Sequence, residues 1–383
     1  MAQHKTIYLD YAAATPMLDE VIEAMKPYSK TYFYNPSATY LAAKKVGQDI
    51  ESARSKVAHW LGARSSEIVF TAGGTEANNL AIHGIMKRYP KANIVISAIE
   101  HESIIAPAAL YECRIVSVLS DGRINLEELE KNIDDNTVLV SIMYANNEIG
   151  TIQPIRDISR IVAKKRALRG VDELPLYLHT DACQATNYLD LHVARLGVDL
   201  MSINGGKIYG PKQSGVLYVK AGASLKPMIE GGGQEHGLRS GTENVSAIIG
   251  LATALDIVQS DRQDELKVKL IPELRELFFA ELEQKIPKAV INGSRKYRLS
   301  NNIHFTIPNT DNERVLMELD ENGIQAAAGS ACNASDETPS HVLRAIGLTD
   351  SDAQSSYRMT IGRYTTKEEI KATLLALQRI ISK

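Results

Sequence analysis

The chain has 383 residues, of which 44% are hydrophobic and 23% are charged. This length predicts about two domains, and the apolar content excludes a chain that is disordered over most of its length. The 43 basic and 46 acidic side chains give a net charge of −3, which offers no basic surface for nucleic acid or an anionic membrane.

The predicted elements alternate between strands and helices through most of the chain. An amphipathic helix is expected at residues 49–61. Strands are expected at 67–71, 93–98, 137–143, 176–180 and 215–219, with helices at 75–89, 100–110 and from Pro154 to about residue 169. Because the strands are continuous apolar runs with helices between them, the pattern predicts a mostly parallel α/β sheet buried on both faces.

The C-terminal third has a different pattern. A long charged helical stretch at 261–286 is followed by a strand at 302–307 and helices at 312–321 and 367–381. We expect a large α/β domain over residues 16–248. Residues 1–15 and 249–383 are expected to form a smaller α+β domain that carries Cys332.

The three cysteines, Cys113, Cys183 and Cys332, are too few for a disulfide framework in a chain of this length. No cysteine or histidine pair has zinc-finger spacing, so no metal site is predicted. The N-terminal residues lack the apolar core of a signal peptide, and no apolar run is long enough to span a membrane. We therefore expect a cytoplasmic protein that does not enter a membrane.

Two segments place polar residues where predicted strands end. Residues 71–79 (TAGGTEANN) pass from a strand through Gly73 and Gly74 into a helix. This segment indicates either phosphate binding at the helix N-terminus or a tight turn capped by Thr75. Asp181 ends another apolar strand, where it either meets a cation at the ligand-binding edge or caps a helix.

Two further segments carry candidate reactive groups. Lys207 lies among glycines in NGGKIYGPK (204–212), which suits a lysine that binds an aldehyde carbon, although a solvated loop lysine also fits. Cys332 lies in AGSACNAS (328–335), where small neighbours indicate an accessible thiol, although most free cysteines are buried. Cys113 and Cys183 flank apolar strands and are interpreted as structural, with Cys183 near any ligand that Asp181 meets.

In this order the motifs resemble the cysteine desulfurases of the NifS/IscS type, which are pyridoxal-phosphate enzymes of the aminotransferase-like fold (fold type I). The resemblance runs from Ile7 to Arg363 and rests on IYLDY at 7–11, NNEIG at 146–150, KIYGPK at 207–212, RSGT at 239–242, GSAC at 329–332 and PSHVLRAIGL at 339–348. The GSAC segment matches the first class of the family. The resemblance implies an enzyme that converts L-cysteine to L-alanine and leaves a persulfide on Cys332.

The resemblance also implies roles around the cofactor ring. Lys207 would bind pyridoxal 5′-phosphate covalently and later move protons at the substrate α-carbon. Asp181 would keep the pyridine nitrogen protonated, and Gln184 would hydrogen-bond the ring oxygen. His101 would stack on the ring and act in acid–base steps.

Around the phosphate, the resemblance assigns Gly74 and Thr75 as ligands, with Asn204 beside them. Thr242 would reach the phosphate across a dimer interface, so a homodimer is expected. Relatives usually have Ser-Gly-His before the lysine, whereas this chain has Asn-Gly-Gly, so Gly206 stands where relatives have histidine. One phosphate contact is therefore unaccounted for, and we predict that the cofactor still binds.

On the substrate side, Arg358 would grip the α-carboxylate, and Arg suits that two-oxygen target. Asn147 would contact cofactor or substrate, and Asn35 is a further candidate for the substrate pocket. Cys332 would take the sulfur and pass it to an acceptor, such as an iron–sulfur scaffold protein or the machinery of tRNA thiolation. Scaffold-serving relatives often continue with a docking tail, whereas this chain stops at Lys383, which leaves the acceptor open.

Two alternatives to a cysteine desulfurase remain from the sequence. A selenocysteine lyase or another pyridoxal-phosphate lyase would use the same cofactor. The second alternative is not an enzyme but a catalytically weak regulator with the same fold, and Gly206 is the only residue that supports this hypothesis. Retention of the candidate residues Lys207, Asp181, His101, Cys332 and Arg358 argues against that second reading.

Overall fold

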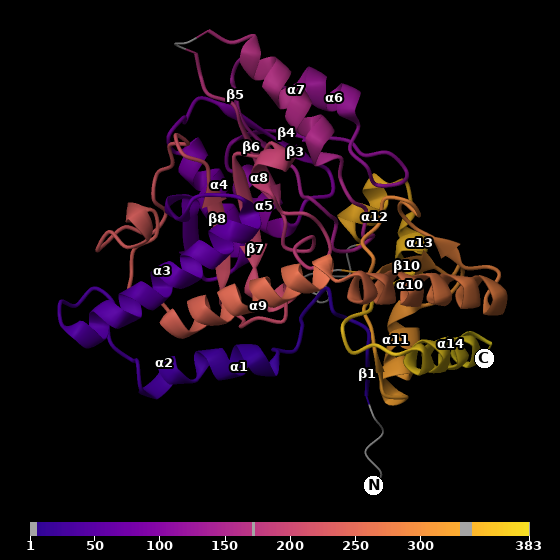
Figure 1. Cartoon of the computed structure of the whole chain (residues 1–383). Coiled ribbons are helices and arrows are strands. Elements are labelled where there is room, and N and C mark those ends of the chain that lie inside the picture. Colours follow the sequence, from indigo (N-terminus) through magenta and orange to yellow (C-terminus); the bar gives the residue numbers. More distant parts are fainter. Residues whose placement is uncertain (1–5, 171–172, 330–338, 383) are drawn as a thin grey trace.

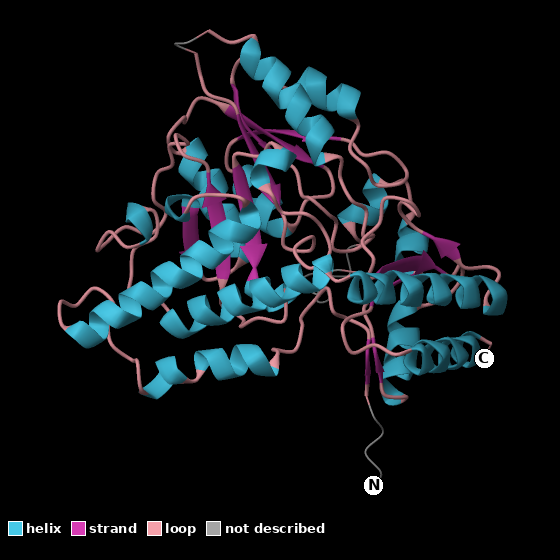
Figure 2. Cartoon of the chain, viewed as in Figure 1, coloured by secondary structure: helices cyan, strands magenta, loops and turns pink. Residues whose placement is uncertain are grey.

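The computed structural model describes residues 6–170, 173–329 and 339–382. Its centre is a seven-stranded sheet (Figure 1, Figure 2). The strands are β2 (Ile68–Thr71), β3 (Asn93–Ser97), β4 (Glu112–Val116), β5 (Thr137–Ser141), β6 (Tyr177–Asp181), β7 (Leu200–Asn204) and β8 (Gly215–Val219). They lie in the order β2-β8-β7-β6-β5-β3-β4, and only β8 runs antiparallel to its neighbours. The predicted mostly parallel sheet is confirmed.

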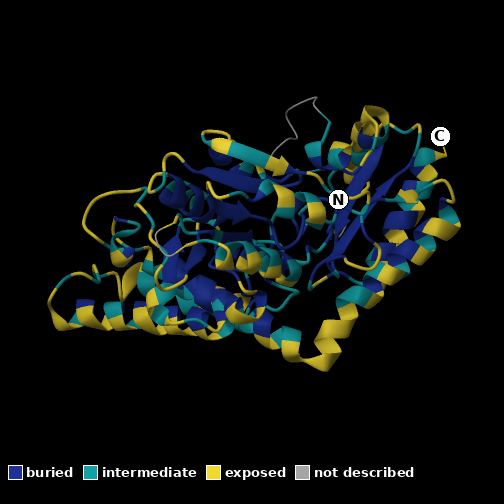
Figure 3. Ribbon diagram, turned by 90° about the horizontal axis from the view of Figure 1, so that it is seen from above, coloured by how far each residue is buried: buried dark blue, intermediate teal, exposed yellow. Residues whose placement is uncertain are grey.

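Side chains on the two faces of this sheet enter two apolar clusters. Ile68 and Phe70 face one cluster, and Val69 between them faces the other, as the strand period of two requires. The first cluster lies under α3 (Leu41–Leu61), α6 (Leu126–Asn132), α7 (Ile155–Ala167), α8 (Val193–Leu196) and α9 (Val245–Gln263). The second lies under α4 (Gly74–Met86) and α5 (Glu102–Ala108). The central strands are therefore buried on both faces (Figure 3).

Three helices lie side by side below the sheet in Figure 1. They are α1 (Asp19–Met25), α3 and α9, with the short α2 (Pro27–Lys30) beyond α1. The helix predicted at 49–61 begins earlier, at Leu41, and ends where Gly62 takes a left-handed conformation with φ of 61° and donates to Ala58 O and His59 O. That conformation is easily reached by glycine, which lacks Cβ.

The smaller part of the chain surrounds a separate core. Strands β9 (Val290–Ile291), β10 (Asn302–Thr306) and β12 (Ser356–Thr360) form an antiparallel sheet, and β1 (Ile7–Tyr8) pairs in parallel with β11 (Ile324–Gln325). Helices α10 (Glu265–Lys285), α11 (Asn312–Glu321) and α14 (Lys367–Ile381) cover this sheet. The predicted α/β large part and α+β small part are therefore both present.

Two further helices join the parts. The helices α12 (His341–Ala345) and α13 (Asp350–Gln354) supply Val342, Leu343 and Ala353 to an apolar cluster with Ile99, Met143 and Ile149. These last three residues follow β3 and β5, so the cluster ties the C-terminal part to the edge of the large sheet where those strands end.

The border between the parts falls within a helical region. The stretch predicted as one helix over 261–286 is divided at Asp264, whose side chain accepts hydrogen bonds from the first backbone N–H groups of α10. Helix α9 crosses residue 249, and its apolar residues as far as Val258 belong to the core of the large sheet. The expected division at residue 249 stays a prediction.

No helix within the described ranges is long and apolar enough to cross a membrane.

Candidate active site

The candidate residues gather where the parallel strands of the large sheet end. Asp181 is the last residue of β6, and Asn204 is the last residue of β7. His101 follows β3, and Gly74 follows β2. Because parallel strands end at one edge of a sheet, residues far apart in sequence meet there.

One cavity of about 540 Å³ lies at the N-terminus of α4, and we call it the α4 cavity. Gly73, Gly74 and Thr75 line one side of it. Its lining also includes Asn204, the last residue of β7, together with Gly206 and Lys207 of the 3₁₀ turn η2 (Gly205–Lys207). The Asn204 carboxamide accepts a hydrogen bond from Gly206 N at 3.0 Å and so fixes this turn.

The α4 cavity has the features of a phosphate site. The first N–H groups of a helix have no partner within the helix and carry the positive end of its dipole. Gly74 lets another segment approach, because a Cβ there would lie 2.6 Å from Cys183 Sγ. Gly73 and Gly74 thereby keep backbone rather than side chain facing the cavity.

Gly74→Ala is expected to destabilise the protein by about 1–3 kcal/mol and to weaken phosphate binding, since the new methyl group overlaps Cys183 Sγ. Adding Cys183→Ala removes that sulfur, so the double variant should recover part of both losses. Urea unfolding and titration with pyridoxal 5′-phosphate measure the two effects, with Cys183→Ala alone as the matched control. Equal stability of Gly74→Ala and the wild type would contradict the packing argument.

A second cavity of about 80 Å³ adjoins the first and shares Gly74, Thr75, Asn204 and Lys207 with it. We call it the Asp181 cavity. The other candidate residues on its wall are His101, Asn147, Asp181, Gln184 and Arg358. Nine of the sequence-predicted residues therefore line two connected cavities.

The Asp181 carboxylate is held in a buried position. Its Oδ1 accepts from Cys183 N at 2.9 Å, and its Oδ2 accepts from Asn78 Nδ2 at 2.7 Å. Asn78 is itself buried and also donates to Ser103 Oγ at 2.8 Å. These bonds fix the carboxylate on the wall of the cavity, where it can accept from a cationic ring N–H.

His101 is oriented by the helix that it caps. Its Nδ1 accepts from Ser103 N at 3.1 Å and lies 2.9 Å from Ser103 Oγ, so the imidazole is fixed at the start of α5. The preceding Glu100 is fully buried, and burial raises the pKa of its carboxyl to about 8. Glu100 accepts from Ser97 Oγ at 2.5 Å and Met143 N at 2.9 Å, which anchors the His101 segment to β3 and β5.

Lys207 lies between the two cavities. Its Nζ donates to Ala13 O at 2.5 Å, and its own carbonyl accepts from Asn187 Nδ2 at 2.7 Å. The backbone is thus held from behind while the ammonium group lies against the N-terminal segment. This places the lysine within reach of a group that occupies both cavities.

Arg358 lies on β12 and is 2% exposed. Its Nη2 donates to Asp10 Oδ1 at 2.7 Å and its Nη1 to Asn147 O at 3.3 Å. Its Nε has no hydrogen-bond partner among the described residues. Burial raises the pKa of Asp10, and the Arg358 charge opposes that shift. Asp10 was not predicted as a site residue, although it lies in the IYLDY motif.

Three predicted residues are not placed in these cavities. Asn35 is exposed between α2 and α3, where its side chain accepts from Ser37 N at 2.9 Å. Thr242 is exposed and lines a cavity of about 160 Å³ that shares Ala72 and Gln213 with the α4 cavity. Cys332 lies outside the described residues.

The two other cysteines are within the described ranges. Cys183 lines the Asp181 cavity, and burial raises the pKa of its thiol well above the usual value. Cys113 lies half-buried on the edge strand β4, and burial raises its pKa as well. Neither environment favours a thiolate at neutral pH.

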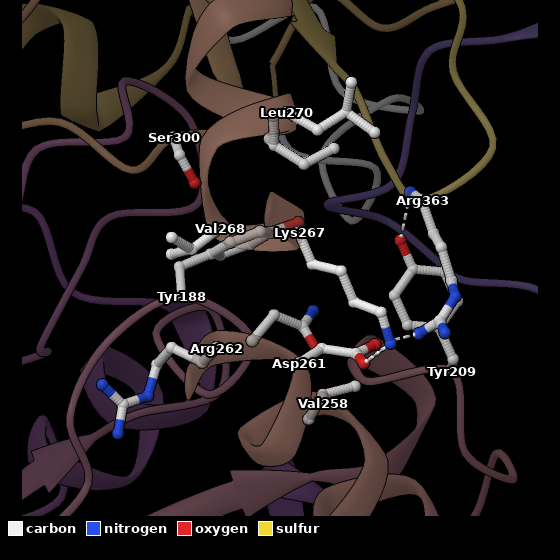
Figure 4. Close-up of a pocket in the computed structure, with 12 residues that line it drawn as sticks. Tyr188, Tyr209, Val258, Asp261, Arg262, Lys267, Val268, Leu270, Ser300 and Arg363 are labelled. Carbon is white, nitrogen blue, oxygen red and sulfur yellow. Dashed lines mark hydrogen bonds and ion pairs between the residues drawn. The ribbon is translucent and has the colours of Figure 1, made fainter. Parts of the chain in front are cut away.

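A further cavity of about 240 Å³ lies between α9 and the start of α10 (Figure 4). Asp261 there pairs with Lys267 and Arg363, each at 2.5 Å. Tyr209 OH accepts from Arg363 N at 2.8 Å. None of the sequence-predicted site residues lines this cavity, so we do not include it in the candidate site.

Comparisons with known proteins identify the family of this chain. The sequence profile of the class-V aminotransferases matches residues 7–373. The cysteine desulfurase IscS of Dictyoglomus turgidum is 42% identical and covers 99% of this chain and 95% of its own length. That of Methanosarcina thermophila is 39% identical and covers 100% and 93%.

Solved structures show the same fold. A NifS-like protein superposes with a TM-score of 0.90 at 33% identity, covering 99% of this chain and all of its own. A structure described as SspA in complex with cysteine has a TM-score of 0.80 at 35% identity and covers 94% of this chain and all of its own. The chain belongs to the class-V aminotransferase family and, within it, to the cysteine desulfurases.

Proposed function

We propose that the α4 cavity and the Asp181 cavity together hold pyridoxal 5′-phosphate and L-cysteine. The observation that carries this proposal is that Asp181, His101, Lys207 and Arg358 line one cavity that opens onto a helix N-terminus. The α4 N-terminus is suited to the anionic phosphate, Asp181 to the cationic ring nitrogen and Arg358 to the substrate carboxylate, so each group meets one of opposite charge. The structure described with bound cysteine concerns a relative at 35% identity and supports the same substrate class here.

The polar groups present fit this cofactor. The α4 N-terminus suits the phosphate, and the buried carboxylate of Asp181 suits a protonated pyridine nitrogen. Arg358 Nε is buried without a partner among the described residues, so an incoming carboxylate would satisfy it. When bound, pyridoxal phosphate withdraws electrons from the substrate α-carbon.

The residues of this chain would then have separate roles toward the cofactor and the substrate. Asp181 holds the ring-nitrogen proton, and Gln184, which donates to Ala12 O at 3.0 Å, lies on the same wall to bond the ring oxygen. Lys207 would hold the aldehyde carbon and would afterwards move a proton at the substrate α-carbon. His101 would lie against the ring and exchange protons with the reacting groups, and Asn147 would contact cofactor or substrate.

We propose that Cys332 takes the sulfur. Its thiolate attacks the substrate sulfur, so an S–S bond forms on the enzyme as the substrate C–S bond breaks. The methyl carbon of alanine takes a proton in place of sulfur. Overall, one enzyme thiol and one cysteine become one enzyme persulfide and one alanine, and an acceptor then removes the outer sulfur.

Arg358→Lys is expected to raise the KM for L-cysteine about tenfold or more with a smaller change in kcat, because lysine keeps the charge but loses the two-pronged contact. Steady-state alanine formation measures both constants. Arg344→Lys, in an exposed ion pair with Asp350, is the matched control and should behave as the wild type. A larger loss in kcat than in KM would contradict a role in binding the carboxylate.

We also propose a homodimer in which Thr242 completes the phosphate site of the other chain. Thr242 is exposed beside the α4 cavity rather than in it. Several apolar side chains are exposed on residues 32–41, where Phe33 is 67% exposed, Tyr40 53% and Leu41 84%. Such a patch is typical of a protein–protein contact.

Mixing the inactive variant Lys207→Ala with Thr242→Ala tests this arrangement. If Thr242 acts across the interface, a mixed dimer contains one complete site, and activity should rise above that of Thr242→Ala alone. Alanine formation after co-refolding or subunit exchange measures the effect. Activity that stays at the Thr242→Ala level in proven mixed dimers would place Thr242 in its own site.

The sulfur acceptor and the cytoplasmic location stay predictions. We propose an acceptor protein such as an iron–sulfur scaffold, because a persulfide on the enzyme must be passed to a second thiol or cluster. The ratio of alanine formed from L-cysteine to that formed from L-selenocysteine distinguishes a desulfurase from a selenocysteine lyase.

A further inference from the structure

Lys212 lies on the wall of the α4 cavity, five residues after Lys207 in the KIYGPK segment. It is exposed, and its Nζ donates to Thr15 O over a long distance of 3.4 Å. Among the described residues that line this cavity, the only two cations are Lys207 and Lys212. A bond of this length is weak, so the ammonium group can turn to a stronger acceptor.

The space in front of Gly206 is occupied by the Lys212 side chain. A Cβ at Gly206 would lie 3.5 Å from Lys212 Cγ and 3.5 Å from Asn204 Oδ1. These distances are ordinary van der Waals contacts, so the methylene stem of Lys212 packs beside the turn η2. The segment thus brings an ammonium group to the wall where no side chain of residue 206 supplies a donor.

The charged side chains of the α4 cavity leave the phosphate without an assigned cation. Glu76 is its acidic residue, and its carboxylate already accepts from Arg239 Nε at 2.9 Å and Ala72 N at 3.1 Å. Lys207 is committed to the aldehyde end of the cofactor in the proposed function. A phosphate dianion at the α4 N-terminus would therefore be balanced by the helix dipole and by one further cation.

We propose that Lys212 is that cation and binds the phosphate of pyridoxal phosphate directly. This inference rests on the proposed function and adds to it a phosphate-binding residue. Lys212 supplies a charge-assisted hydrogen bond from the cavity wall, beside Gly206, which itself has no side-chain donor.

The test compares two probes on the full-length chain after removal of cofactor. Pyridoxal 5′-phosphate and pyridoxal share the aldehyde and ring, and only the first has a phosphate. Lys212→Gln is expected to raise the dissociation constant of pyridoxal phosphate about tenfold or more and to leave that of pyridoxal unchanged. Absorbance titration measures binding without any turnover.

Two further variants make the result specific. Lys371→Gln removes one exposed positive charge on the distant helix α14 and should leave both dissociation constants unchanged. Lys212→Arg keeps the charge and should remain within about threefold of the wild type. Higher ionic strength should narrow the difference between Lys212→Gln and the wild type, because salt screens an exposed charge.

The outcomes separate the inference from the function on which it rests. Equal pyridoxal phosphate binding by Lys212→Gln and the wild type would overturn the inference alone. An equal loss of both probes would also overturn it, because Lys212 would then act on folding and not on phosphate. A wild-type chain that binds neither probe would overturn the proposed function together with the inference.

Discussion

Lys207→Ala is expected to lower alanine formation from L-cysteine by roughly 10³-fold or more and to abolish the visible absorbance of the cofactor–lysine linkage. Lys207 is the one described lysine that lines both the α4 cavity and the Asp181 cavity. No other described amine is therefore placed to hold the aldehyde and also reach the substrate α-carbon. Amino-acid analysis and absorbance spectroscopy measure the two losses.

The fold should survive this substitution. The Lys207 side chain donates to Ala13 O, so its removal leaves that carbonyl to water or to a neighbour at a cost of about 1 kcal/mol. Lys207→Arg is the matched control, because it keeps a cation but cannot form the covalent link. A Lys207→Ala protein that retained both activity and the absorbance band would remove Lys207 from the mechanism.

Asp181→Asn is the second substitution with a large expected effect, a fall in kcat of roughly 10³-fold. An uncharged amide cannot hold the proton on the pyridine nitrogen, so the cofactor loses its ability to withdraw electrons. The kcat for alanine formation and the absorbance of the bound cofactor measure the loss. Asp181→Glu, which keeps the charge but lengthens the side chain, should retain more activity than Asp181→Asn.

The surroundings of Asp181 predict that Asp181→Asn folds normally. The oxygen of the introduced amide can still accept from Cys183 N, and its NH₂ group would face Asn78. Asn78 Oδ1 is buried without a partner among the described residues, so a flip of the Asn78 amide would supply the acceptor. Thermal unfolding within a few degrees of the wild type, together with lost activity, is therefore the expected pair of results. A large loss of stability with retained kcat per folded molecule would contradict the proposed role.

The strands that the sequence predicted share one property. Five of them, β2, β3, β5, β6 and β8, are short, largely buried segments of a chain in which strands and helices alternate, and four of the five are mainly apolar. Strand β4 was missed because it lies at the edge of the sheet and carries the charged residues Glu112 and Arg114. Strand β12 was missed because Arg358 interrupts its apolar run.

Helix α9 was not predicted from the sequence pattern. Its apolar residues lie on every side, so no polar face marks it as a helix. The division predicted at residue 249 falls inside this helix, whose packing on the large core is a long-range contact that no local pattern contains.

In the candidate site, local motifs predicted the residues but not the long-range contacts between them. Motifs identified the residues that line the two cavities, because several motifs place a polar side chain where a strand ends, as at Asp181 and Asn204. The pairing of Asp10 with Arg358, which are 348 positions apart, and the support of Asp181 by Asn78 depend on tertiary packing. Asp10 and Asn78 lie within the motifs IYLDY and TAGGTEANN, but no local pattern shows which side chain each of them contacts.

Transfer of sulfur from L-cysteine to Cys332 is tested most directly by the yields of alanine and sulfide in the presence of a thiol reductant. The wild type, Cys332→Ala and the control Cys113→Ala are compared. We expect equal alanine and sulfide from the wild type and the control, and loss of both from Cys332→Ala while its cofactor absorbance remains. Full activity of Cys332→Ala would contradict transfer to this thiol and indicate a lyase that releases sulfide without an enzyme thiol.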